Sequence, residues 1–138
     1  MLAARDTLNL KTKIVGVVCA HASAYAESFS SGRPVESPVS TKIADGIACR
    51  IHELSALELI WKGVEKIVQV SDIEIAESMR IIYECTHNFC QGAGADAIAA
   101  ALKESSKNKG LKVSVITSVG NVDRDVFAKI LNGENFVD

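Results

Sequence analysis

The chain has 138 residues, a formal net charge of -2, and 48% apolar residues. This length and composition are usual for one globular domain, so disorder is not expected. The mildly acidic balance, with a pI near 5.9, gives no basic face for a nucleic acid. The one lysine-rich stretch, Lys103 to Lys112, is interpreted as a solvated helix end and loop.

The four cysteines are Cys19, Cys49, Cys85 and Cys90, and no two of them form a C-x-x-C pair. A metal site at Cys85, His87 and Cys90 could be imagined, but zinc usually has tighter cysteine pairs and four ligands. Buried free thiols are therefore favoured. No apolar run is long enough to span a bilayer, and the charged amino-terminal residues do not resemble a signal peptide. These features predict no membrane partner and a reducing, cytoplasmic location.

The first half of the chain predicts two helices, a strand and a long loop. Residues 1–10 have the apolar spacing of a helix, and residues 14–19 form a β-branched run typical of a strand that is covered on both faces. Residues 21–31 predict a helix that the following glycine closes. Residues 33–53 form a loop that is long for a compact domain, and long loops are often functional.

The middle of the chain predicts helix, strand and helix. Residues 54–63 form a short helix and residues 66–70 the next strand. Ser71 and Glu74 have the spacing of a capping box, in which the serine and the glutamate satisfy each other's backbone amides. This box is expected to open a long helix that reaches about residue 86.

An alanine-rich helix, headed by Gly92 and Gly94, follows. Residues 112–117 predict a third strand, which leads into a turn at residues 118–121. Residues 123–131 predict the last helix.

Strands that alternate with helices predict an α/β fold with three layers, in which helices flank a mostly parallel sheet. The whole chain, residues 1–138, is predicted to form one such domain. Three strands make a thin sheet, because parallel sheets are usually bounded by further strands. Part of a larger domain is therefore expected to be missing.

Ligands of open parallel sheets bind beyond the carboxyl ends of the strands. Residues 18–23, the loop at 43–46 and the turn at 117–121 should therefore converge. Ser118 offers a hydroxyl there and Gly120 a flexible backbone. One glycine after a strand is nevertheless more typical of an ordinary turn than of a binding site.

The remaining candidates have simple structural interpretations. The Q-G-A-G-A run at residues 91–95 could cradle a phosphate, but close helix packing is favoured, because the run lacks the full G-x-G-x-x-G spacing and does not follow a strand directly. His21, His52 and His87 are more typical of surface or capping residues, and no catalytic triad follows from their spacing. Asp45 is expected to form a turn.

Four segments, taken together and in order, resemble the threonine/serine dehydratases, which are fold-type-II pyridoxal-phosphate enzymes related to serine racemase. The segments are KIVGVV, TKIADGIACRI, QGAGADAIAAAL and VITSVGNVD, with VSDIEIAESMR between them. The resemblance covers about residues 1–133. It implies a partial fold-type-II domain that corresponds to the carboxy-terminal part of such an enzyme.

The resemblance implies five cofactor-binding residues. Ser118 matches the serine that hydrogen-bonds the pyridine nitrogen of pyridoxal phosphate, and Gly46 matches a glycine beside the cofactor ring. Gln91 stands where the family commonly has glutamate, near the same ring edge. Gly120 and Asn121 match the end of the family's S-G-G-N turn.

The departures from the family pattern concern catalysis. No segment matches the motif of the Schiff-base lysine or the phosphate-binding glycines, so no catalytic residue is assigned. Val119 replaces the first glycine of the S-G-G-N turn. The positions that hold acidic metal ligands in some relatives are Val18 and Ala24 here, so no metal site is expected.

Three hypotheses follow. The chain is a truncated dehydratase that is inactive alone, or a half-enzyme completed by a lysine-bearing chain, or a non-enzymatic module that binds a small anion or amino acid. A thin sheet with open edges also favours a homo-oligomer. The resemblance implies pyridoxal phosphate as the family's cofactor, but without the lysine it does not imply that this chain binds it.

Overall fold

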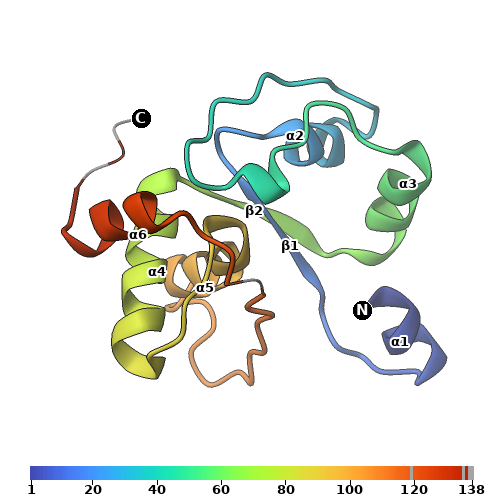
Figure 1. The fold of residues 1–138 in the computed structure, drawn as a ribbon. Helices are drawn as coiled ribbons and strands as arrows, with labels where there is room; N and C mark the ends of the chain where they lie inside the picture. Colours follow the sequence, from blue (N-terminus) through green and yellow to red (C-terminus); the bar gives the residue numbers. More distant parts are fainter. Residues whose placement is uncertain (119, 135, 137–138) are drawn as a thin grey trace.

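The structure is a computed structural model that describes residues 1–118, 120–134 and 136. A two-stranded parallel sheet runs through its middle, with helices on both sides (Figure 1). Strand β1 (Val15–Cys19) pairs with β2 (Lys66–Val70), and Val17 lies opposite Val68. Both strands are rich in β-branched residues, which pack well on a pleated surface. The predicted three-layer α/β fold is confirmed.

Three helices lie on one side of the sheet. Helix α5 (Gly92–Lys103) contacts both strands, α4 (Asp72–Thr86) packs along α5, and α6 (Arg124–Leu131) packs against α4. The main apolar core fills the space between these helices and the sheet, and Ile75 and Met79 of α4 are almost fully buried in it.

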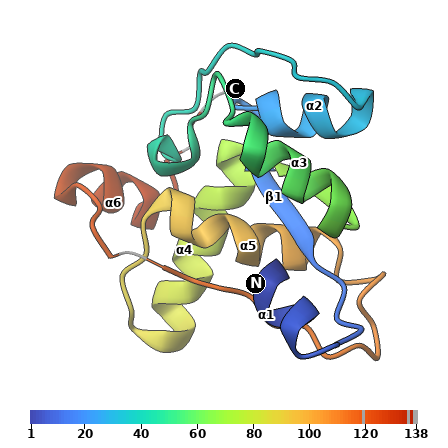
Figure 2. The same cartoon turned by 90° about the vertical axis from the view of Figure 1, so that its right-hand side faces the viewer.

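The other side of the sheet carries α2 (Ala24–Ser31) and α3 (Leu54–Gly63). The long loop between them contains a single 3-10 turn, η1 (Asp45–Ile47), which contacts α5 (Figure 2). Helix α1 (Leu2–Thr7) packs against the end of α3, where the Arg5 guanidinium donates to the carbonyl oxygen of Gly63 at 2.8 Å. The loop therefore reaches from the α2/α3 layer to the first turn of α5.

The predicted capping box is present. The Glu74 amide donates to Ser71 Oγ at 3.2 Å, and the Ser71 amide donates to Glu74 Oε2 at 2.8 Å. These two bonds satisfy donors that the first turn of a helix would otherwise leave unpaired. Helix α4 consequently begins immediately after β2.

Most predicted helices and strands have bounds within a few residues of those expected. Helix α3 and strand β2 match their predicted ranges, whereas α2 begins at Ala24, three residues later than predicted. The helix predicted over residues 1–10 ends at Thr7, because Asn9 has a left-handed backbone with φ of 50°.

The third predicted strand is not formed. Residues 112–117 run past the helices without a strand beside them, and in the described residues no backbone hydrogen bond joins them to β1 or β2 (Figure 2). Val113 and Ile116 are 51% and 61% exposed. An apolar run becomes a strand only where another strand supplies the ladder of hydrogen bonds, and neither edge of this sheet lies against the segment.

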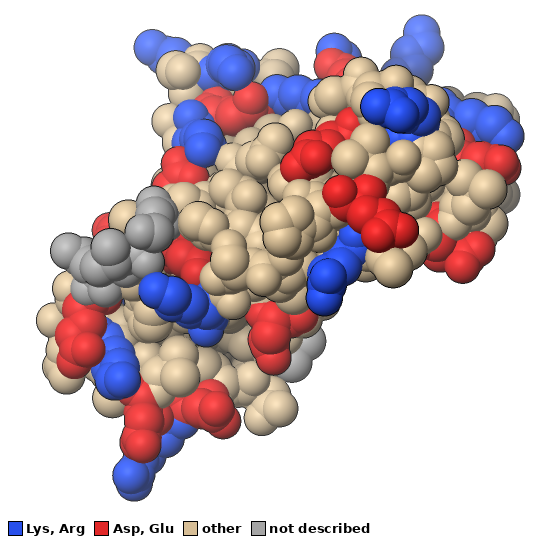
Figure 3. Space-filling model, turned by 90° about the horizontal axis from the view of Figure 1, so that it is seen from above, with Lys and Arg blue, Asp and Glu red and all other residues tan. Residues whose placement is uncertain are grey.

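Charged side chains of both signs are interspersed on the face shown in Figure 3, around an uncharged central area. The lysine-rich stretch forms the end of α5 and the turns after it, as predicted. Lys103 pairs with Glu74 and Lys107 with Glu104, each at 3.0 Å. In the part of the chain that the structure describes, no helix is long and apolar enough to cross a membrane.

Candidate functional site

Two glycines at the start of α5 bring distant segments together. A β-carbon at Gly92 would lie 1.9 Å from the carbonyl oxygen of Ile43, and one at Gly94 would lie 1.8 Å from that of Ser118. Both distances are far below van der Waals contact, so only glycine fits at either position. The packing interpretation of the Q-G-A-G-A run is thus confirmed. The loop before η1 and the turn at Ser118 both rest on the backbone of one helical turn.

Two further contacts extend this junction. A β-carbon at Gly46 would lie 2.9 Å from Cβ of Ala93 and 3.0 Å from Nε2 of Gln91, and one at Gly120 would lie 3.3 Å from the carbonyl oxygen of Phe89. Gly46 is therefore adjacent to the N-cap of α5, and Gly120 to the segment before that helix.

The structure brings together four of the five residues predicted to bind a cofactor. The loop at Gly46 and the turn with Ser118 and Gly120 both pack on residues 89–94, the segment that contains Gln91. Asn121 follows Gly120 directly and is exposed. Val119, which stands in place of the first glycine of the family's S-G-G-N turn, lies outside the described residues. Because Gly46, Ser118 and Gly120 are also exposed, the junction is open to a ligand from solvent.

Local hydrogen bonds shape the loop at Gly46. The Gly46 amide donates to Asp45 Oδ1 at 2.9 Å, and the Ile47 amide donates to the carbonyl oxygen of Ala44 at 3.1 Å. Asp45 thus forms a turn, as expected from its residue type.

A buried thiol, Cys90, lies beneath the junction. Its Sγ donates to the carbonyl oxygen of Gln91 at 3.3 Å and to that of Ser118 at 3.5 Å. Burial, and then the nearby Asp96 carboxylate, raise the pKa of the Cys90 thiol, which favours the protonated donor form. Sequence reasoning predicted a buried thiol here but not its contact with Ser118.

The cysteine prediction holds in part. All four cysteines are free, and Cys19 and Cys90 are buried. Cys85 is exposed and Cys49 partly exposed, so burial was wrongly predicted for those two. Cys85 lies in the last turn of α4, whose apolar face points the other way.

The histidines differ from one another in their surroundings. His87 caps the end of α4 with a left-handed backbone, as expected for a capping residue. The ring of His52 lies 5.5 Å from that of Tyr25, and its Nδ1 is buried with no hydrogen-bond partner within the described residues. Nδ1 of His21 lies 3.4 Å from Oγ of Ser40. Among the described residues, no three His, Cys, Asp or Glu side chains are grouped as metal ligands would be.

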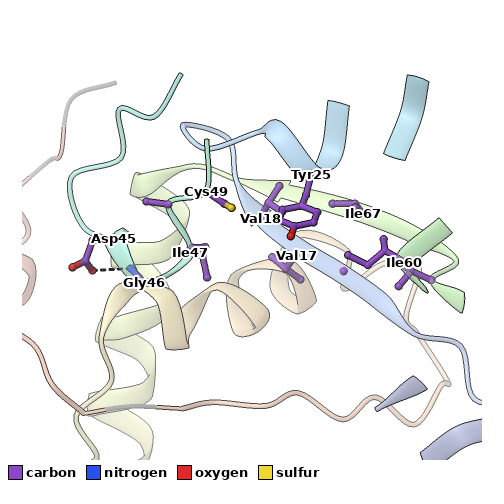
Figure 4. A pocket seen from close by; sticks show the side chains of 12 residues that line it. Val17, Val18, Tyr25, Asp45, Gly46, Ile47, Cys49, Ile60 and Ile67 are labelled. Atoms are coloured by element: carbon purple, nitrogen blue, oxygen red, sulfur yellow. Dashed lines mark hydrogen bonds between the residues drawn. The ribbon is translucent and has the colours of Figure 1, made fainter. Parts of the chain in front are cut away.

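A cavity of about 440 Å³ extends from this loop along the sheet. Asp45 and Gly46 lie at one end of it, and Ile60 and Ile67 at the other (Figure 4). Its walls are mainly apolar, and Val17 of β1 forms part of them. The cavity therefore joins the junction at Gly46 to the side of β1.

Comparison with known proteins identifies the family. The sequence pattern of the family described as "Pyridoxal-phosphate dependent enzyme" matches residues 1–120. The chain belongs to this family. The L-threonine ammonia-lyase of Thermotoga maritima is 31% identical over 126 residues, which are 91% of this chain and 31% of that protein.

Solved structures agree with this assignment to the pyridoxal-phosphate enzymes. Threonine deaminase isoform 2 of Solanum lycopersicum superposes with a TM-score of 0.85 and 27% identity, over 95% of this chain and 37% of that one. Maize serine racemase superposes with a TM-score of 0.81 and 25% identity, over 96% and 41%. The threonine/serine dehydratase resemblance is confirmed. The chain spans about a third of the length of the curated relatives it matches.

The junction fits one side of the family's cofactor. Gly46 packs so closely on Ala93 and Gln91 that a side chain there would displace one of them, and its exposed backbone lies beside the Gln91 amide. Ser118 adds a neutral hydroxyl, and Gln91 an amide, from the two neighbouring segments. A hydroxyl and an amide are neutral groups that can hydrogen-bond the edge of a pyridine ring.

We expect Gly92→Ala and Gly94→Ala each to lower the free energy of unfolding by about 1–3 kcal/mol, despite the better helix propensity of alanine, because the new methyl group meets a backbone carbonyl. Urea unfolding followed by circular dichroism measures this. Ser106→Ala, at an exposed turn position, is the control and should change stability by less than about 0.5 kcal/mol. Full stability of both glycine variants would contradict the close packing.

A second prediction concerns Asp96 on the buried side of α5. Burial raises the pKa of its carboxyl to about 6. The protonated acid thus favours folding at low pH, and this contribution is lost as the pH rises through about 6. Asp96→Asn should therefore be more stable than the natural chain at pH 8, by up to about 3 kcal/mol, with the difference fading toward pH 4.

Urea unfolding between pH 4 and 8 tests this expectation. Asp125→Asn removes a carboxyl that is 85% exposed on α6, and it should show no comparable pH dependence. A stability difference for Asp96→Asn that is the same at every pH would mean that the carboxyl has the same pKa in the folded and unfolded chain, which contradicts the raised value.

Proposed function

We propose that this chain forms the ring-side wall of a pyridoxal-phosphate site in an L-threonine/L-serine dehydratase. The observation that carries the proposal is the convergence of Gly46, Gln91 and Ser118 at the first turn of α5, enforced by glycines that accept no β-carbon. The similarity to L-threonine ammonia-lyases and threonine deaminases supports the same reaction class, in which an amino acid yields a 2-oxo acid and ammonia.

Each residue at the junction has a distinct proposed role. Ser118 would donate a hydrogen bond to the ring nitrogen, and a neutral hydroxyl would leave that nitrogen largely unprotonated. Gly46 would border the ring with its backbone, and Gln91 would contact the edge of the ring. Gly120 and Asn121 would hold the turn that carries Ser118. When bound, pyridoxal phosphate withdraws electrons and so eases loss of the α-proton and the β-hydroxyl group of the substrate.

We further propose that the 138 residues do not catalyse this reaction alone. None of their lysines matches the family's covalent lysine, and no segment matches its phosphate-binding glycines. Proton transfer at the substrate's α-carbon needs such a base. We also propose a cytoplasmic location, because all four cysteines are free, as is usual in a reducing compartment.

Titration with pyridoxine 5′-phosphate tests the proposed site, because this analogue has the ring and phosphate but no aldehyde that could react with a lysine. We expect saturable binding by calorimetry, weakened about 2- to 10-fold in Ser118→Ala, as befits one lost hydrogen bond. Ser106→Ala should bind as the natural chain does. No saturable binding would contradict the cofactor site and favour a module for another small ligand.

Borohydride reduction in the presence of pyridoxal phosphate tests the proposal that these 138 residues do not catalyse the reaction alone. We expect no single lysine to be modified stoichiometrically, as judged by peptide mass spectrometry, and no ammonia to be released from L-serine or L-threonine. One lysine modified at full stoichiometry would show that a residue of this chain has taken the covalent role.

A second candidate function is that of a half-enzyme, and the open side of β1 favours it. Among the described residues β1 pairs only with β2, Val15 is 40% exposed, and the apolar cavity lies beside Val17. An unpaired edge next to an apolar cavity can accept a further strand. The partner would be a chain that carries the lysine and the phosphate-binding glycines.

Mixing experiments test this candidate with the amino-terminal part of a threonine dehydratase as the partner. We expect a one-to-one complex in size-exclusion chromatography and release of 2-oxo acid from L-threonine. Val17→Asp should abolish the complex, because it places a charge in the apolar cavity. Leu59→Asp, at a position 61% exposed on α3, is the matched control. Equal complex formation by both variants would show that β1 is not the contact.

A further inference from the structure

A buried carboxylate lies between the sheet and the loop that carries Gly46. Asp72, the first residue of α4, is only 3% exposed. Its Oδ1 accepts a hydrogen bond from Oγ1 of Thr41 at 2.7 Å, and its Oδ2 accepts one from the Lys42 amide at 2.7 Å. Oδ1 also accepts one from Sγ of Cys19 at 3.2 Å. One side chain therefore joins the end of β1, the start of α4 and the loop.

These bonds explain why a charge is tolerated here. Hydrogen bonds to an ionised acceptor are shorter and stronger than neutral ones, and the first turn of a helix favours a negative charge. Burial raises the pKa of the Cys19 thiol, which keeps the proton on sulfur and available to Asp72.

Helix capping does not account for Asp72. Ser71 and Glu74 already form the reciprocal capping bonds of α4, at 3.2 and 2.8 Å. The Asp72 carboxylate accepts hydrogen bonds from Cys19, Thr41 and the Lys42 amide, which lie 30 or more positions earlier in the chain. Its contacts are thus those of an anchor between segments.

The anchored segment leads straight to Gly46. Oγ1 of Thr41 accepts a hydrogen bond from the Ala44 amide at 3.1 Å. Because the same hydroxyl donates to Asp72, the carboxylate fixes Ala44 through Thr41. Ala44 is fully buried, and the carbonyl oxygen of Ile43 is the one that packs on Gly92. The loop is therefore fixed from two sides, by Asp72 at residues 41–42 and by α5 at residue 43.

We propose that Asp72 is a positioning residue that fixes the loop at residues 41–46 and thereby places Gly46 in the cofactor site. Its effect on cofactor binding rests on the function proposed above, whereas its hold on the loop does not. The carboxylate acts through Thr41 and the Lys42 amide.

Amide hydrogen exchange of Lys42 and Ala44, followed by NMR, tests the hold on the loop. Asp72→Asn keeps the shape but replaces one acceptor oxygen with an NH₂ donor, so Thr41 and the Lys42 amide cannot both be bonded as before. We expect both amides to exchange at least about 10-fold faster, relative to the Val68 amide of β2, which tracks global unfolding. Ser71→Ala, the matched control, weakens the cap of the same helix and should leave that ratio unchanged.

Thr41→Val provides a second, independent variant. It removes the acceptor of the Ala44 amide but keeps the bond between the Lys42 amide and Asp72, so exchange should quicken more at Ala44 than at Lys42. This variant decides the matter if Asp72→Asn does not fold. Unchanged relative exchange at both amides in the variant that folds overturns the inference.

Pyridoxine 5′-phosphate affinity separates the two proposals. We expect Asp72→Asn to weaken binding at least about 3-fold and Ser71→Ala to leave it unchanged, a difference that loss of helix stability would not produce. If relative exchange quickens but the natural chain does not bind the analogue, the anchoring role stands and the proposed function fails. If the natural chain binds and Asp72→Asn binds equally well, the role of Asp72 in placing Gly46 is overturned.

Discussion

The contact of two backbone carbonyls with the glycines of α5 organises the functional end of this molecule. The carbonyl oxygens of Ile43 and Ser118 lie where a β-carbon of any other residue at Gly92 or Gly94 would be. Backbone can approach backbone so closely only when one partner has no side chain. As a result, two segments about 75 positions apart meet at the first turn of one helix. The open surface between them is what the family resemblance assigns to the cofactor ring.

Polar groups beneath that surface are satisfied by hydrogen bonds within the chain. Asp72 collects hydrogen bonds from β1 and the loop, and Cys90 donates to the carbonyl oxygens of Gln91 and Ser118. A buried donor or acceptor without a partner costs stability, so each bond also fixes where its segment can lie. Side chains that never touch a ligand can in this way determine the shape of the site.

The sheet is the least complete part of the structure. Two strands pair, so each has one edge with no strand beside it among the described residues. The apolar cavity lies beside β1.

Local signals in the sequence determined most of the secondary structure. The capping pair Ser71 and Glu74 needed only neighbours in the chain. The predicted bounds of α3 and β2 are correct. The residues of the cofactor site were predicted from the resemblance of four segments taken together. No single segment has residues that would indicate such a site by themselves.

Tertiary structure decided what depends on distant partners. Residues 112–117 have the composition of a strand but no strand beside them, because ladder hydrogen bonds come from elsewhere in space. In the sequence, Asp72 is one residue of the capping segment between Ser71 and Glu74. In the folded chain its carboxylate accepts hydrogen bonds from Thr41 and the Lys42 amide. Sequence spacing reports contacts within a helix or strand, whereas such long-range contacts exist only once the chain is folded.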